Sequence, residues 1–431
     1  MMGQYNMIKI GTPFITIENE RAELHAPVTI TGDTAKRYVE ETDEIQNIVF
    51  LTKSDYPPAH WKEDGTVWFS VPSEYRDYLC CERSDAFIIA FLWYAMISGS
   101  DICFEAPVSK KLYEGLTQQL IPALAKDGYR AIKLTGPVSS EEIWHENGVV
   151  TGMTCGVDSL YTLACYGTDR APDGMRLTHL VYYDGSYHFP GARPPYDIDE
   201  IYRNKLTGHV PAVDDVRRVA ANNGLPLIYV LTNLDKDYYR GGLPLTGMYR
   251  FLSCTLALAH LYGTYISSSS GHTDNVQISL FEPTQHYEDL ICKTCSTDTL
   301  KYVSSDHDSR CRKLRALADD ADAQKYLNVC FQLGDHGRNC GDCYACWRTM
   351  IPLDIMGKLD GFAERFELDK YHADRKKVFT DLIGFSKIPN ESSARDCVRQ
   401  FAALAEKEQS EAGREFLEIL SDIENIPVYV E

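Results

Sequence analysis

Four cysteines lie close together near residue 340, in the segment VCFQLGDHGRNCGDCYACWRTM. They are Cys330, Cys340, Cys343 and Cys346. Two overlapping Cys-x-x-Cys units follow one further cysteine, which puts four thiolates within reach of one tetrahedral centre. Four soft thiolates favour structural Zn²⁺, or less often an iron–sulfur cluster, over four buried free thiols. Because all the ligands are protein thiolates, we expect a closed, structural metal site rather than a catalytic one.

The segment TCGVDS forms a second candidate site between an apolar strand and a helical run. Its residues are Thr154, Cys155, Gly156, Val157, Asp158 and Ser159. A short loop before a helix N-terminus presents free backbone N–H groups to an anion, and small residues let a phosphate approach closely. Asp158 and Ser159 can cap the helix, bind phosphate through the hydroxyl or hold Mg²⁺ through the carboxylate. An ordinary capped turn explains the same pattern, and neither a Walker A loop nor a GxGxxG fingerprint is present.

The elements around this loop indicate an α/β fold. From residue 147, the apolar segments GVVTGM, LTHLVYYDG, LPLIYVLTN and GTYISSSS alternate with helical patterns. This alternation predicts a parallel sheet with helices on both faces, and such sheets bind ligands where their strands end. Polar residues at the other expected strand ends are Asp184, Thr232, Asn233, Asp235 and the serines at 268–270.

The remainder of the chain divides into two further regions. Residues 1–80 contain short strand patterns, among them MIKIGTPFITIE, ELHAPVTITG, NIVFLT and TVWFSVP. A buried helix is expected near 85–98, and an amphipathic helix from a cap at Ser109 to Gly128. We therefore expect a β-rich α+β domain over 1–145, an α/β domain over 146–329, and a zinc-bearing helical region over 330–431.

Composition limits the classes of partner. The 431 residues carry a net charge of −19, which disfavours a nucleic-acid partner but leaves room for a local basic site for one nucleotide. The most apolar stretch, AFIIAFLWYAMI, is too short to span a bilayer, and the first residues do not resemble a signal peptide. We expect a cytoplasmic protein without a membrane partner, and among its 14 cysteines the clustered ones indicate metal binding or catalysis rather than disulfides.

The segment GMTCGVDSLYTL resembles the SGGxDS signature of the PP-loop ATP pyrophosphatases, in the adenine nucleotide alpha-hydrolase superfamily. Gly156, Asp158 and Ser159 match the signature, Thr154 keeps a hydroxyl, and Cys155 replaces a glycine. The resemblance implies a HUP-type sheet and a loop that binds the pyrophosphate portion of ATP. If the backbone at Cys155 requires φ > 0, the cysteine is strained there, and the loop is bent differently or ATP turnover is reduced.

The order of this loop and the later cysteine cluster is similar to that in the 7-cyano-7-deazaguanine synthase family. The resemblance covers about residues 147–365 and leaves out 1–145. It implies ATP, Mg²⁺ and Zn²⁺ as cofactors, catalytic roles for Asp158 and Ser159, and Asp184 beside the adenosine. The implied activity is adenylation of a carboxylate such as 7-carboxy-7-deazaguanine, followed by attack of ammonia or an amine. The N-terminal domain would recognise this small acid or a peptide or protein acceptor.

Two alternatives remain open at this stage. The first is sulfur transfer, in which a persulfide attacks the adenylate; Cys155, Cys292 and Cys295 are its candidate thiols. The second is a nucleotide-binding module that has lost catalysis, as the cysteine in the loop suggests. The sequence also leaves a homodimer open.

Overall fold

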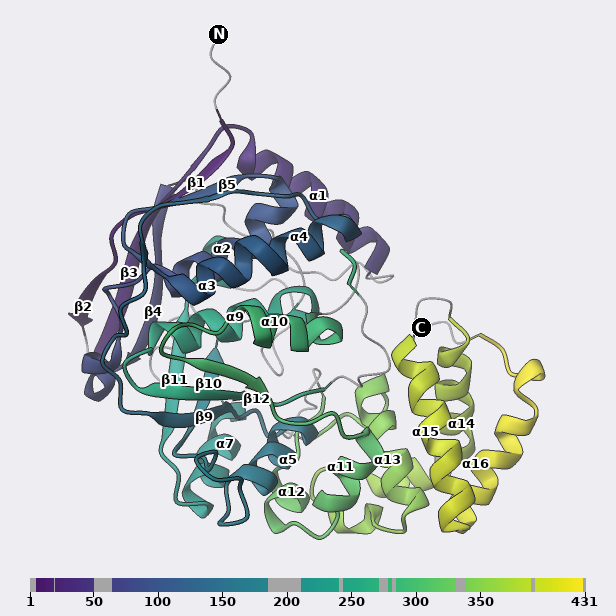
Figure 1. Cartoon of the computed structure of the whole chain (residues 1–431). Coiled ribbons are helices and arrows are strands. Elements are labelled where there is room, and N and C mark those ends of the chain that lie inside the picture. The colour runs from purple at the N-terminus through teal and green to yellow at the C-terminus, as the bar shows by residue number, and fades with distance from the viewer. Residues whose placement is uncertain are drawn as a thin grey trace.

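A single large sheet organises most of the chain. The computed structural model describes residues 5–18, 20–49, 64–184, 211–239, 243–270, 278–280, 284–330, 338–388 and 392–428. The strand order in the sheet is β13-β12-β9-β10-β11-β4-β3-β1-β5-β7, and β2 pairs with β3 beside this path. Figure 1 shows the sheet running from the N-terminal strands to β12, with the C-terminal helices to one side.

Five neighbouring strands are parallel; the sequence predicted the first four along the chain, and the fifth was not predicted. They are β9 (Gly148–Gly152), β10 (His179–Asp184), β11 (Leu227–Thr232), β12 (Tyr262–Ser267) and β13 (Lys301–Ser304). The first of them along the chain, β9, lies in the middle. The chain adds β10 and β11 on one side and then returns to add β12 and β13 on the other. The strand order therefore reverses between β9 and β12, the place where open α/β sheets bind their ligands.

Helices cover both faces of this parallel part. The connecting helices are α5 (Val157–Tyr166), α7 (Pro211–Asn222), α8 (Leu234–Asp237), α9 (Leu243–Ala257), α10 (Glu288–Thr294) and α11 (Arg310–Leu317). Successive strand residues belong to different hydrophobic clusters: Val149 packs in one and Val150 in the other. Because strand side chains alternate between faces, this division shows that each face has its own core.

The N-terminal strands continue the same sheet. They are β1 (Met7–Ile10), β2 (Phe14–Glu18), β3 (Arg21–Thr31), β4 (Asp64–Pro72), β5 (Asp101–Phe104) and β7 (Leu134–Thr135), while β6 (Val108–Ser109) and β8 (Val138–Ser139) form a separate pair. Strand β4 pairs antiparallel with β11 through Ser70 and Leu231. The sheet is thus continuous across the predicted domain boundary at residue 145, which itself stays a prediction.

One predicted strand is wrong. The segment NIVFLT begins in the last turn of helix α1 (Thr34–Val49), and its remaining residues lie outside the described ones. Tyr38 and Thr42 are buried at helical spacing, and the Tyr38 ring stacks on Tyr94 with centroids 3.7 Å apart. This tertiary contact favours a helix, whereas the apolar run at its end favours a strand only locally.

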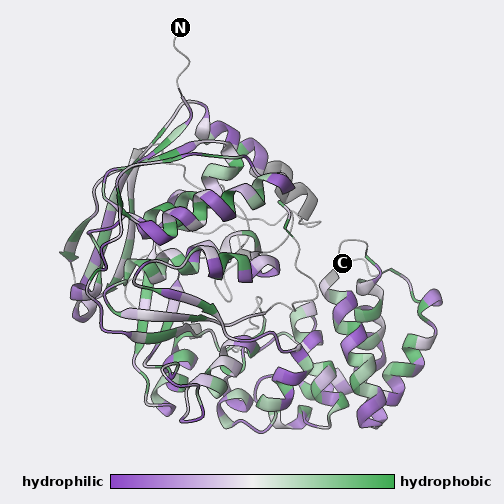
Figure 2. Ribbon diagram, viewed as in Figure 1, coloured by the Kyte–Doolittle hydropathy of each residue, from purple (hydrophilic) through white to green (hydrophobic). Residues whose placement is uncertain are grey.

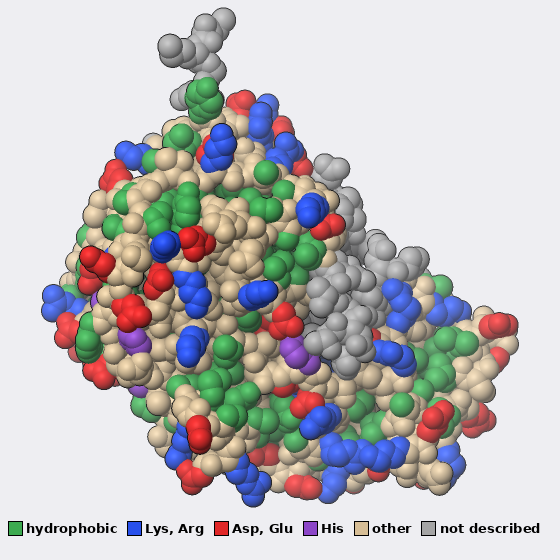
Figure 3. Space-filling view, in the orientation of Figure 1, with side chains coloured by type: hydrophobic (Ala, Val, Ile, Leu, Met, Phe, Trp, Pro, Cys, Tyr) green, Lys and Arg blue, Asp and Glu red, His purple; other side chains and the backbone are tan. Residues whose placement is uncertain are grey.

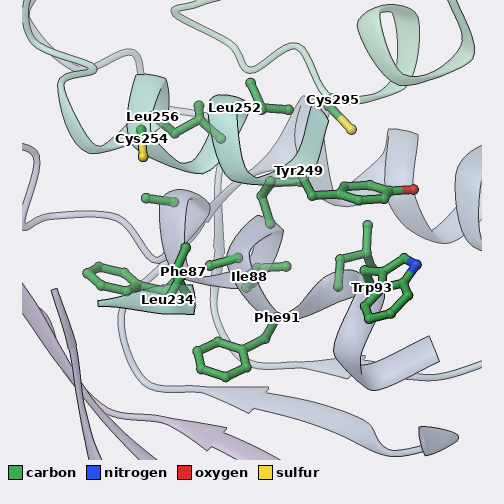
Figure 4. Packing of buried hydrophobic residues seen from close by; sticks show 14 of the residues in the cluster. Phe87, Ile88, Phe91, Trp93, Leu234, Tyr249, Leu252, Cys254, Leu256 and Cys295 are labelled. Carbon is green, nitrogen blue, oxygen red and sulfur yellow. The ribbon is translucent and has the colours of Figure 1, made fainter. Parts of the chain in front are cut away.

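The predicted buried helix is confirmed as α2 (Asp85–Ser98), in which every residue is buried. Its Phe87, Ile88 and Phe91 belong to the same buried cluster as Leu252 and Leu256 of α9, and Figure 4 shows α9 packed along one side of α2. The helix is apolar on all sides because the sheet and several helices surround it.

The predicted helix from residue 109 to Gly128 is also present, but its geometry changes along its length. It consists of α3 (Lys110–Gly115), a π-helical segment (Leu116–Leu120), α4 (Ile121–Leu124) and a 3₁₀ turn (Ala125–Asp127). Pro122 lacks an N–H group, which explains the departure from α geometry before it. Ser109 does not cap this helix; its hydroxyl donates to the buried Asp85 carboxylate instead.

The C-terminal region is helical, as predicted. Its helices are α13 (Tyr344–Ile355), α14 (Leu368–Ser386), α15 (Ser392–Glu408) and α16 (Glu411–Ser421), and α12 (Ala321–Tyr326) lies just before the region. Short 3₁₀ segments are Ser73–Tyr78, Thr284–Tyr287, Leu359–Phe362 and Ile423–Asn425. Hydrophobic and hydrophilic residues alternate along the last helices (Figure 2), and acidic and basic side chains are interspersed on the visible surface (Figure 3). Within the described part of the chain, no helix has the length and apolarity needed to cross a bilayer.

Candidate functional site

The structure brings the four predicted cysteines together. Their ligand atoms all lie within 4.8 Å of one another. The Sγ–Sγ distances are 3.8 Å for Cys330–Cys343, 3.9 Å for Cys340–Cys346 and 3.5 Å for Cys343–Cys346. A tetrahedral zinc ion with bonds of about 2.3 Å needs sulfur separations of roughly 3.8 Å. The cluster therefore has the composition and the spacing to hold a metal such as zinc.

The cluster is built on the start of α13 and a short turn before it. Cys343 is the N-cap of α13, and Cys346 lies in its first turn, where the helix dipole favours thiolates. Asn339 Oδ1 accepts hydrogen bonds from the backbone N–H groups of Val329 and Cys330. These bonds hold Cys330 beside the other three cysteines. Hydrogen bonds among the four thiols lower the pKa of Cys340 and raise the pKa of Cys343 and of Cys346. A bound cation would favour the thiolate at all four positions.

The TCGVDS loop lies where the strand order reverses, between β9 and α5. Cys155 has φ = +57°, in the left-handed region that favours glycine. The expected strain at this position is therefore present, and it amounts to about 1–2 kcal/mol for a residue with a Cβ. Its carbonyl oxygen accepts a hydrogen bond of 2.8 Å from the backbone of Asn328. The side chain is fully buried and burial raises the thiol pKa, so Cys155 is not a reactive thiol.

The other loop residues leave the helix start open. Gly156 is the N-cap of α5 and has no side chain to cap the helix, while Val157 is buried in the core. The Ser159 hydroxyl donates to the Gly156 carbonyl (3.1 Å) and accepts from the Thr154 N–H (3.4 Å). The first N–H groups of an α-helix have no partner within the helix. This loop therefore combines an uncapped helix start with hydroxyls close by, as an anion site requires.

Lys313 on α11 connects the loop to the neighbouring strand ends. Its Nζ lies 3.0 Å from Asp158 Oδ1 and 3.2 Å from Asp306 Oδ1, and it donates to the carbonyl of Ser269. Only 2% of the Lys313 side chain is exposed. Burial raises the pKa of Asp158, but the surrounding cations outweigh this effect and lower its pKa below the ordinary value. Asp158 is thus a carboxylate held among cations rather than a helix cap.

Two arginines complete this cluster. Arg310 Nη1 lies 3.5 Å from Asp158 Oδ2, and its Nη2 donates to Thr349 (3.0 Å). The Arg348 guanidinium lies over the Tyr344 ring, 5.5 Å from its centroid. In the part of the chain that the structure describes, the buried Nε atoms of both arginines have no hydrogen-bond partner. Burial, together with the charge of Arg348, lowers the pKa of Arg310 to about 10.

Cations gather around Asp158 in this cluster. Lys313, Arg310 and Arg348 bring three positive charges, the two carboxylates paired with Lys313 bring two negative ones, and the nearby buried carboxyl of Glu288 also interacts with Lys313. Buried donors without partners cost free energy unless a ligand binds them. The two Nε donors of the arginines and the uncapped helix start together suit an anion such as a phosphate.

The metal cluster and the loop are directly connected. Asn328, which holds the Cys155 carbonyl, lies two residues before Cys330, and Arg348 lies two residues after Cys346. Both connections pass through short backbone segments rather than long side chains. A metal ion held by the four cysteines would therefore fix the position of the loop on one side and of its arginine on the other.

The remaining polar residues at the strand ends have structural partners. Asp184 is buried and accepts a hydrogen bond of 2.6 Å from the Tyr229 hydroxyl, so its place beside an adenosine stays a prediction. Asn233 bonds to Thr66 and Trp68 and joins β11 to β4. The side chain of Asp235 lies outside the described residues.

Sequence reasoning missed Glu288, a buried carboxyl at the start of α10. Burial raises its pKa to about 7, although hydrogen bonds with Ser267 and Ser269 oppose this shift. It therefore can exchange a proton near neutral pH close to the end of β12. A glutamate in the first turn of a helix is common, so no pattern in the sequence separates this one from a surface residue.

The thiols considered for sulfur transfer are unsuited to it. Cys292 and Cys295 are both buried on or beside α10. Burial raises the pKa of Cys292 well above its ordinary value and that of Cys295 to about 12. Because the thiolate is the nucleophile, neither has the character of a persulfide carrier.

Comparison of the chain with models of protein families, with curated proteins and with solved structures found no match. The function must therefore be inferred from the site itself. The resemblance of the loop and the cysteine cluster to known families remains a hypothesis that an experiment has to test.

Proposed function

We propose that the chain is an ATP-dependent ligase of the PP-loop type that forms AMP and releases pyrophosphate. The loop of residues 154–159 would hold the pyrophosphate portion of ATP. The observation that carries the proposal is the buried cation cluster around Asp158, at the reversal of the strand order. A central β9 with two parallel strands on each side also supports the HUP-type arrangement that the resemblance implies.

The proposed reaction has two steps. First, an oxygen of the substrate carboxylate attacks the α-phosphorus of ATP, and the bond to the oxygen that bridges to the β-phosphorus breaks. Pyrophosphate leaves with that oxygen and its negative charge, and an acyl-adenylate remains. Ammonia or an amine then attacks the acyl carbon, AMP leaves, and the nitrogen loses a proton. A 7-carboxy-7-deazaguanine-like acid is the first substrate to test, and the amine would be free or on a peptide or protein.

Residues of this chain would act mainly by position and charge. Lys313 and Arg310 would lie near the departing pyrophosphate, where preorganised positive charges stabilise a transition state strongly. The uncapped N–H groups of α5 and the Ser159 hydroxyl would orient the phosphates. When bound, Mg²⁺ neutralises part of the phosphate charge. Lys313 already lies between Asp158 and Asp306. The phosphate oxygens of ATP would therefore supply most of the Mg²⁺ ligands, and these carboxylates few of them.

The alternatives have less support. Sulfur transfer requires an accessible thiolate, but Cys155, Cys292 and Cys295 are buried. A module that binds nucleotide without turnover would have the same cation cluster, so only a measurement separates it from a ligase. The cysteine at position 155 does not by itself favour the module without catalysis. Its backbone has the left-handed conformation that a glycine at this position of the loop would also adopt.

The test is ATP–Mg²⁺ binding and acid-dependent pyrophosphate release by the zinc-loaded protein. Arg310→Gln should weaken ATP binding by about 10- to 100-fold, since a charge-assisted hydrogen bond contributes roughly 1.5–3 kcal/mol. Arg312→Gln is the matched control, because Arg312 lies on the same helix with 72% of its side chain exposed. Ser159→Ala tests the loop itself.

Each result has a clear meaning. Release that depends on an acid and falls in the Arg310 and Ser159 variants supports the ligase. Tight ATP binding without release for any acid and amine supports the module without catalysis. Absence of ATP binding by the metal-loaded wild type would overturn the proposal.

A further inference from the structure

A second group of possible metal ligands lies where the N-terminal region meets the parallel sheet. It consists of Cys80, Glu82 and His260, whose ligand atoms all lie within 4.8 Å of one another. Cys80 and Glu82 lie just before α2, whereas His260 lies between α9 and β12. Cys80 and His260 are buried, and 52% of the Glu82 side chain is exposed, which leaves an approach from solvent.

The histidine is oriented toward the other two groups. Its Nδ1 lies 2.6 Å from the carbonyl oxygen of Trp144, and that oxygen can only accept a hydrogen bond. Nδ1 therefore carries the proton, and Nε2 faces Glu82 at 3.0 and 3.2 Å from its two oxygens. In a neutral imidazole with the proton on Nδ1, Nε2 carries a lone pair, and this lone pair would face the negatively charged oxygens of Glu82. A cation must lie between them, either a proton or a metal ion.

The third ligand distinguishes these two cations. A protonated histidine and a glutamate need no thiol for their ion pair, whereas here the Sγ of the buried Cys80 also lies within 4.8 Å of the other two ligand atoms and forms a hydrogen bond with Glu82. Tetrahedral zinc with bonds of about 2.0–2.2 Å to nitrogen and oxygen needs a separation of roughly 3.3 Å between them, close to the distances found. Metal-bound histidines commonly donate their second N–H to a backbone carbonyl, as His260 does to Trp144.

We propose that Cys80, Glu82 and His260 bind a second zinc ion, with water as the fourth ligand. His260 lies two residues before β12 and Trp144 precedes β9, so the site lies at the amino ends of these strands, opposite the TCGVDS loop at their carboxyl ends. The ion would fasten the segment before α2 to the parallel sheet. This proposal is independent of the ATP reaction.

The test counts zinc ions in the full chain. Protein purified without chelator is incubated with Zn²⁺, dialysed, and measured by elemental analysis and native mass spectrometry. We expect two zinc ions per chain in the wild type and one in Cys80→Ser and in His260→Gln. Cys81→Ser is the matched control, because Cys81 is the adjacent, half-buried cysteine and is not part of the group. It should keep two.

Further measurements make the result decisive. Circular dichroism checks that each variant is folded, and Co²⁺ in place of Zn²⁺ should show a second, weaker thiolate-to-metal absorption that Cys80→Ser removes. One zinc ion per wild-type chain after incubation overturns the proposal even if no variant folds. Two zinc ions in folded Cys80→Ser and His260→Gln overturn it as well. The ATP experiments give no information on this point, so the two proposals fail separately.

Discussion

The left-handed conformation of Cys155 predicts that glycine is more stabilising than alanine at this position, whereas the opposite order is expected at a helical cysteine. Alanine and glycine both remove the buried Sγ of Cys155, so the loss of its burial is common to the two variants. They differ in the Cβ, which costs about 1–2 kcal/mol in the left-handed region. Glycine also loses more chain entropy on folding, by about 0.5–1 kcal/mol. We therefore expect Cys155→Gly to be more stable than Cys155→Ala by roughly 1 kcal/mol.

Cys254 provides the matched control. It is equally buried but lies inside α9, and its φ is not positive. In a helix interior glycine is about 1 kcal/mol less favourable than alanine. The order of stability should therefore reverse, with Cys254→Gly less stable than Cys254→Ala. The difference between the two pairs amounts to about 2 kcal/mol.

Urea denaturation of the four variants, followed by far-ultraviolet circular dichroism, measures this difference. Midpoints are compared within each pair, so that the shared loss of the thiol cancels. If glycine is less stable than alanine by the same amount at both positions, Cys155 is not left-handed in solution and the reasoning about the loop is refuted. Under the proposed function, Cys155→Gly should also bind ATP as well as the wild type, since the thiol takes no part in the reaction.

Three further predictions concern the metal and the buried carboxyls. Removal of zinc from the cysteine cluster should abolish ATP binding, measured by calorimetry, because the cluster fixes Asn328 and Arg348; binding that persists in zinc-free protein contradicts that connection. Burial raises the Asp85 pKa from 3.8 to about 6, so ionisation of this residue destabilises the fold progressively as pH rises from about 4 to 6. Asp85→Asn should therefore be more stable than the wild type by up to about 3 kcal/mol at pH 8 and by less at pH 5. Burial raises the Glu288 pKa from 4.5 to about 7, so Glu288→Gln should gain stability as pH rises from about 4.5 to 7 and keep that gain above pH 7; urea midpoints across pH check both, and a gain that does not change over these ranges argues against either shift.

The sequence carried the parts of the site that depend on local spacing. The cysteine cluster follows from Cys-x-x-Cys units within one short segment, and the loop follows from small residues between a strand and a helix. The parallel strands and the buried α2 follow from apolar runs of the right length. In each of these cases, the residues that decide the structure are neighbours along the chain.

The remaining features depend on contacts between distant residues. Lys313, Arg310 and Arg348 are ordinary basic residues in helical patterns, and only the packing of α11 on α5 and of α13 on α11 makes them a cluster. Cys80 and His260 are 180 positions apart in the sequence, so no spacing rule joins them. The end of α1 was mistaken for a strand because an apolar run has the same composition in both kinds of element.

The pairing of β4 with β11 has a consequence for truncation of this protein. A chain shortened to residues 146–431 would leave the outer edge of β11 without its neighbour and would uncover the face of α9 that packs on α2 (Figure 4). An open strand edge beside an apolar helix invites aggregation. Insolubility or inactivity of such a fragment would then reflect a missing half of the core, and would say nothing about whether residues 1–145 recognise a substrate.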